Sequence, residues 1–67
     1  MRVRYDKLWR KMKDNKMKKK DLASAAGISL STITKMANEE FVSMEIIARM
    51  CKIFHCDIGE IVEIIDD

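Results

Sequence analysis

Polar side chains recur on one face of a helix predicted near the middle of the chain. They follow the spacing i, i+3, i+4 and i+7 that defines one side of an α-helix: Ser31, Thr34, Lys35 and Asn38. The opposite side carries the apolar residues Ile33 and Met36. Hydroxyl, amide and ammonium groups can all donate hydrogen bonds. This face therefore has the chemistry to bind acceptor groups on nucleic-acid bases and phosphates.

Three consecutive lysines, Lys18, Lys19 and Lys20, open the helix predicted before this one. Each positive charge at a helix N-terminus costs about 0.3 to 1 kcal/mol, because the helix dipole is itself positive there. A phosphate at this point would meet the lysines together with the free backbone amides of the first turn. We interpret the triplet as a phosphate anchor, and a merely solvated triplet is the alternative.

The net charge of +2 conceals a strong asymmetry along the chain. Residues 1–20 contain ten Lys or Arg and two acids, whereas residues 21–67 contain three Lys or Arg and nine acids. Such a basic segment favours a polyanionic partner. A solvated basic helix would have the same composition, so charge alone does not decide between the two interpretations.

Hydrophobic periodicity predicts the elements that position these residues. We expect five helices, at residues 5 to about 15, 19–26, 30–37, 44 to about 54 and 57 to about 64. Ser29 and Ser43 are suitable N-caps, and Asp57 with Glu60 resembles a capping box for the last helix. Gly27 suits the left-handed conformation that ends a helix, and Asn38 also tolerates it.

The predicted fold is compact and all-α, a single helix-turn-helix domain over residues 1–67 with a core at about residues 5–64. The tail at residues 61–65 is more apolar than a free terminus should be. It has three possible explanations: packing on the core, pairing as a short strand with residues 3–5, or contact with another subunit.

A helix-turn-helix at about residues 18–38 is formed by the second and third predicted helices and the glycine turn between them. In such a unit the second helix enters the DNA major groove while the first crosses the backbone. The strongest motifs are DLASAAGIS at 21–29, STI at 31–33, and SME at 43–45 followed by an apolar helix. Over about residues 5–63 the chain resembles the Cro-like, xenobiotic-response-element type of phage and bacterial repressors.

This resemblance implies roles for individual residues. The positions that match typical base readers are Leu30, Ser31 and Lys35. Lys35 would donate to guanine O6 or N7, and Leu30 would press on a thymine methyl. The positions implied to touch the DNA backbone or neighbouring bases are Thr32, Thr34 and Asn38, in addition to the anchor Lys18, Lys19 and Lys20.

The sequence departs from the family pattern at several positions. Glu39 and His55 stand where glycine is usual, and Lys18 replaces the usual cap of the second helix. Glu40 follows where basic or polar residues are common. Both acids would repel phosphates near the expected DNA face.

Cys51, His55 and Cys56 lie close together in sequence, yet a structural zinc site usually requires four ligands. Free cysteines at apolar positions behave as small hydrophobic residues, so we expect neither a metal nor a disulfide. With one histidine and no phosphate-cradling glycine loop, the chain offers no catalytic constellation. We therefore predict no enzyme and no cofactor.

The leading hypothesis is a small transcriptional regulator that binds double-stranded DNA in a sequence-specific way, with a homodimer possible. A protein-interaction module such as an antitoxin-like partner is the alternative, and RNA binding is a third option that lacks stacking aromatics. No apolar run approaches the roughly 18 residues of a membrane span and no signal peptide is recognisable, so a cytoplasmic protein is expected. Nothing in the sequence indicates a membrane or a small-molecule ligand.

Overall fold

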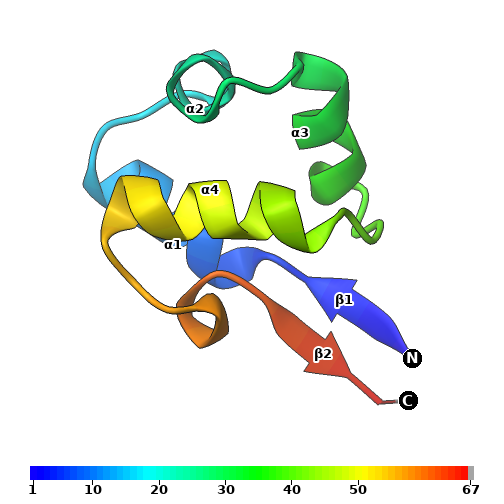
Figure 1. Cartoon of the computed structure of the whole chain (residues 1–67). Helices are drawn as coiled ribbons and strands as arrows, with labels where there is room; N and C mark the ends of the chain where they lie inside the picture. Colours follow the sequence, from blue (N-terminus) through cyan, green and yellow to red (C-terminus); the bar gives the residue numbers. More distant parts are fainter. Residues whose placement is uncertain (67) are drawn as a thin grey trace.

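The computed structural model describes residues 1–66 (Figure 1). Within them lie four α-helices: α1 (Asp6–Asp14), α2 (Lys19–Ala26), α3 (Leu30–Ala37) and α4 (Met44–Phe54). A single 3-10 turn, η1 (Ile58–Glu60), follows α4. The strands β1 (Arg2–Arg4) and β2 (Glu63–Ile65) pair in antiparallel fashion, with Val3 opposite Ile64, and so bring the two ends of the chain together (Figure 1). The bounds predicted for α2, α3 and α4 are confirmed.

The prediction of a fifth helix at residues 57 to about 64 is wrong. The predicted capping contact exists, since the Asp57 backbone amide donates to Glu60 Oε2 at 3.3 Å, but it starts only one 3-10 turn. The residues that follow are mostly β-branched, which favours extended backbone over helix. Residues 63–65 pair with β1, while Ile61 is fully buried in the core.

The hydrophobic core lies between the four helices and the small sheet. Its members come from β1, from the four helices, and from Tyr5 and Ile61 in the connecting segments: Val3, Tyr5, Leu8, Met12, Leu22, Ala23, Ala26, Ile33, Met36, Ile47, Met50 and Ile61. Two residues near the ends of the described chain thus belong to the core, Val3 before α1 and Ile61 after η1. Among residues 1–66, no helix is long and apolar enough to cross a membrane.

Local hydrogen bonds explain where the helices begin and end. Ser29 Oγ accepts from the Thr32 amide at 3.4 Å, and Ser43 Oγ accepts from the Ile46 amide at 3.3 Å, as their N-cap positions predict. Gly27 has the predicted left-handed conformation, with φ of +67°. At the end of α3, however, Asn38 has φ of −90°, and it is Glu39 that is left-handed at +59°.

Candidate nucleic-acid interface

An arginine of α4 stabilises the turn between α2 and α3. Arg49 Nη1 donates to the carbonyl oxygens of Ala26 at 3.0 Å and Gly27 at 3.3 Å, which are unsatisfied groups at the end of α2. Its Nη2 contacts Glu45 Oε2 at 2.8 Å, one helical turn earlier. This role of Arg49 could not be predicted from the sequence. The only signal was the favourable i, i+4 spacing of Glu45 and Arg49, which says nothing about α2.

The outer face of α3 gathers the residues predicted to contact DNA. Ile33 and Met36 are almost completely buried and fix the orientation of the helix. The opposite side is exposed, and it carries Leu30, Ser31, Thr34, Lys35 and Asn38. Thr32 is half-buried at the edge of this face. The structure therefore brings the residues predicted to contact DNA from this helix together on one face or at its edge. Leu30 is 53% exposed.

Two hydroxyls on this face already have partners within the protein. Thr34 Oγ1 donates to the Leu30 carbonyl oxygen at 3.0 Å, and Ser31 Oγ lies 2.8 Å from Ser29 Oγ. Among residues 1–66, no hydrogen bond or ion pair engages the Lys35 ammonium. The Lys35 ammonium is therefore available to donate to an external acceptor.

All three lysines of the predicted phosphate anchor are exposed at the start of α2. The backbone amide of Lys18 is not free, because it donates to Asp21 Oδ2 at 2.9 Å. Asp21 also supplies the acidic charge that a helix N-terminus favours, which offsets part of the cost of the lysines. The Lys19 ammonium lies 5.6 Å from the centre of the Trp9 ring, close enough for a cation–π contact.

The acids after α3 are held against the N-terminal part of the chain. Arg4 Nε lies 3.6 Å from Glu39 Oε2, an ion pair too long for a direct hydrogen bond. The Tyr5 hydroxyl donates to the backbone carbonyl oxygen of Glu40 at 2.7 Å. Burial raises the pKa of Tyr5, so its hydroxyl stays protonated and remains a donor. Pairing with Arg4 offsets part of the repulsion that Glu39 would exert on a phosphate.

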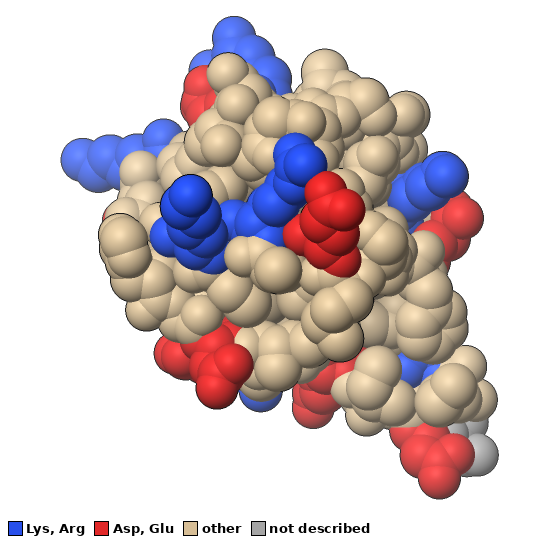
Figure 2. All heavy atoms as spheres, viewed as in Figure 1, with Lys and Arg blue, Asp and Glu red and all other residues tan. Residues whose placement is uncertain are grey.

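Charge is unevenly distributed over the face shown in Figure 2. Basic side chains project at the upper and left margins, over α2 and the loop before it, and others lie at the centre over α4 beside an acidic one, whereas acidic side chains predominate below, over η1 and β2. On this face, positive charge therefore predominates toward α2 and negative charge toward η1 and β2. A polyanion would be attracted to the end of the molecule that carries α2.

The cysteines lie at the end of α4 and show no metal-site geometry. Within residues 1–66, no group of three or more His, Cys, Asp or Glu side chains is placed to hold a metal ion. Both Cys51 and Cys56 are half-buried free thiols. Burial, followed by the neighbouring Cys56, raises the pKa of the Cys51 thiol, which disfavours the reactive thiolate.

Comparison with known proteins agrees with this geometry. Residues 7–67 match the family model of the Cro/C1-type helix-turn-helix DNA-binding domain. The chain is also similar to the transcriptional regulator VanUg in its form II crystal structure, with 39% sequence identity and a TM-score of 0.90. That similarity covers 98% of this chain and 88% of the other. No curated protein matches the sequence significantly.

Proposed function

This chain belongs to the Cro/C1-type helix-turn-helix DNA-binding family and is a DNA-binding regulator, and we propose that it recognises specific duplex sequences by inserting α3 into the major groove. The observation that carries the proposal is the two-sided character of α3. Its inner side is anchored by Ile33 and Met36, and its outer side exposes hydrogen-bond donors beside the lysines of α2. A rigid helix that presents donors in this way suits base recognition.

Base reading is assigned to Leu30, Ser31 and Lys35, and Lys35 makes the central contact. Its ammonium is suited to guanine O6 or N7, and the exposed Leu30 is suited to a thymine methyl group. Ser31 would exchange its contact with Ser29 for a base edge. The residues assigned to the DNA backbone are Lys18, Lys19, Lys20, Thr32, Thr34 and Asn38.

A homodimer is the form in which we expect the protein to act. One recognition helix reads only a few base pairs, and two-fold dimers lengthen the site by placing half-sites about 34 to 36 Å apart. Exposed apolar side chains at Phe41, Met44 and Ile64 supply surface for such a contact. Sedimentation that finds a monomer both free and on DNA would exclude this arrangement.

No catalytic or cofactor role belongs to the proposal, which requires only binding. The site of action is the cytoplasm, the compartment in which a bacterial or phage operator would be met. The chemistry of the proposed interface is that of a positively charged donor surface. It needs no group beyond the side chains and backbone amides already described.

Selection from a random duplex pool at a stated salt concentration tests this function. The proposal predicts enrichment of a defined sequence of a few base pairs, or a two-fold repeat of it if the protein dimerises. Binding that stays equal for the initial and the final pool would reject sequence recognition. A protein that retains no duplex at low salt would reject DNA binding by this surface altogether.

A further inference from the structure

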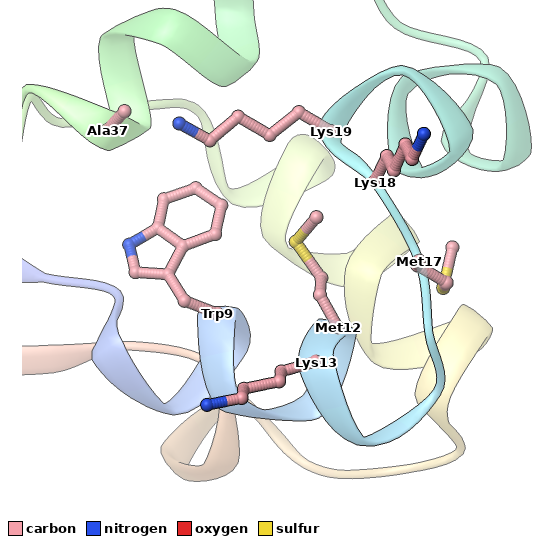
Figure 3. Close-up of a pocket in the computed structure, with 7 residues that line it drawn as sticks. All are labelled: Trp9, Met12, Lys13, Met17, Lys18, Lys19 and Ala37. Atoms are coloured by element: carbon pink, nitrogen blue, oxygen red, sulfur yellow. The ribbon is translucent and has the colours of Figure 1, made fainter.

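A pocket of about 490 Å³ lies beside the candidate DNA interface, where α1 meets the start of α2 and the end of α3 (Figure 3). This volume falls within the range of small-molecule sites, roughly 300 to 1,000 Å³. The walls are formed by Trp9, Met12, Met17 and Ala37, and lysines line the rest. This pocket could not be predicted from the sequence, because residues from separate helices come together to form its walls.

The Trp9 ring is the main apolar surface of this pocket. It meets Tyr5 edge to face, with ring centres 6.5 Å apart and an interplanar angle of 69°, which fixes its orientation. In Figure 3 the Met12 side chain rises beside the ring, and Lys19 extends above it toward Ala37. Thioether sulfurs make favourable contacts with aromatic rings, so this wall suits a flat aromatic body.

The polar groups of the pocket are donors with positive charge. Lys13, Lys18 and Lys19 line it, and among residues 1–66 no acidic side chain does. A ligand that carries its own donors would find no acidic side chain among these described lining residues to accept from them. A carboxylate accepts hydrogen bonds only and pairs well with ammonium groups.

From these walls and charges we infer that the pocket binds a small aromatic carboxylate, with its ring beside Trp9 and its carboxylate at the Lys19 ammonium. The ligand would also regulate DNA binding, a conclusion that rests on the proposed function. Figure 3 places the Lys19 ammonium over the Trp9 side of the pocket, so a carboxylate bound there would compete with DNA phosphates for the charge of Lys19. Ligand binding should therefore weaken DNA binding.

Titration of the full chain with 2-naphthoate, in the absence of DNA, tests the site directly. Trp9 is the single tryptophan, so its indole N–H gives one identifiable peak in a nitrogen–proton correlation spectrum. We expect a saturable shift of this peak. Acetate should cause none, and the cation 2-naphthylmethylammonium should bind about tenfold more weakly or worse, because the lysines repel it. Equal binding of anion and cation, or no saturable shift, would overturn the inference.

A matched pair of variants locates the site. Ala37→Glu places a carboxylate at the pocket, whereas Ala25→Glu makes the same change at an exposed position of α2 outside it. We expect Ala37→Glu to weaken naphthoate binding by about tenfold or more, and Ala25→Glu to leave it within about twofold. Equal losses of naphthoate affinity in both variants would contradict the location of the site. The dispersion of peaks in each spectrum shows whether the variant is folded.

The DNA effect has a separate readout. Naphthoate should reduce the affinity of the wild-type protein for its selected duplex, and it should not affect that of Ala37→Glu. If the Trp9 peak responds to ligand but DNA affinity does not change, the regulatory coupling is wrong and the site stands. If only duplex DNA, and never naphthoate, shifts the peak, the pocket belongs to the DNA interface and the inference is overturned. If the protein binds naphthoate but no DNA, the proposed function is wrong and the ligand site still stands.

Discussion

Arg49 donates a hydrogen bond to the carbonyl oxygen of Ala26 at 3.0 Å and thereby joins α4 to the end of α2. The contact does two things at once. It satisfies an acceptor that the helix leaves unpaired, and it places a positive charge at the negative end of the helix dipole. The turn that sets the angle between α2 and α3 is therefore supported by α4.

Replacing Arg49 should destabilise the fold more than its surface position suggests. We expect Arg49→Ala to lower the free energy of unfolding by about 1 to 2 kcal/mol, because charge-assisted hydrogen bonds are lost at the end of α2. Glu45→Ala removes only the exposed ion pair within α4 and should cost about 0.5 kcal/mol or less. Urea denaturation measures both, and equal losses would show that the α2 contact contributes nothing.

Gly27 and Gly59 form a natural pair for testing backbone strain. Gly27 has φ of +67°, and a Cβ built there would lie 3.4 Å from Arg49 Nη1, whereas a Cβ at Gly59 would meet nothing within 4 Å. Gly27→Ala should cost about 1 to 2 kcal/mol, since the left-handed region is unfavourable for residues with a Cβ. Gly59→Ala should change stability by no more than about 0.5 kcal/mol. Thermal unfolding of the two variants would refute this account if Gly59→Ala were the more damaging.

The buried Tyr5 hydroxyl predicts a decline in stability at alkaline pH. Burial raises the pKa of Tyr5 above its ordinary value of 10.0, although a backbone hydrogen bond with Val42 opposes the shift. The folded state therefore favours the neutral phenol. The resulting stability is fully present below pH 10.0 and is lost as the pH rises through the folded-state pKa.

Tyr5 is the single tyrosine, so tyrosinate absorbance reports its pKa directly. We expect a titration midpoint above 10.0 in the folded protein. Tyr5→Phe should remove the contribution of this residue to the loss of stability at alkaline pH. It should also cost about 1 kcal/mol at neutral pH, because the Glu40 carbonyl loses its donor. A midpoint at or below 10.0 would contradict the role given to burial.

The three lysines of the proposed phosphate anchor predict that DNA affinity depends on salt concentration. DNA affinity should fall linearly on logarithmic axes as salt rises, because bound phosphates release their counterions. Lys20→Ala should reduce the magnitude of that slope by about one unit. Lys52→Ala is the control, since Lys52 is exposed on α4 and has no assigned contact. An unchanged slope for Lys20→Ala would remove Lys20 from the interface, and a flat wild-type response would favour a protein partner.

Helix boundaries could be predicted from the sequence wherever they depend on local chemistry. Ser29 and Ser43 cap as expected, and Gly27 ends α2 in the conformation that glycine favours. The same local logic failed after Asp57. Its capping contact forms, yet β-branched residues and pairing with β1 convert the rest of the expected helix into a strand.

Features that depend on distant parts of the chain could not be predicted. The Arg49 contact, for example, crosses from α4 to α2. The left-handed position after α3 is instead a local feature, and it falls on Glu39, where the family pattern has glycine, rather than on Asn38. The composition of the α3 face was predictable, because helical spacing alone places those residues on one side. Their assignment to bases or phosphates remains a prediction, and the pocket at Trp9 was not foreseen because it requires the packing of three helices.

The most direct test of the central claim compares wild-type, Lys35→Ala and Lys52→Ala proteins on the selected duplex and on an unrelated duplex at one salt concentration. Loss of the Lys35 contact should weaken binding to the selected duplex by about 1 to 3 kcal/mol and reduce its preference over the unrelated one. Lys52→Ala should behave like the wild type on both. Equal affinity of Lys35→Ala and wild type for the selected duplex would contradict the placement of α3 in the major groove with Lys35 as its reader.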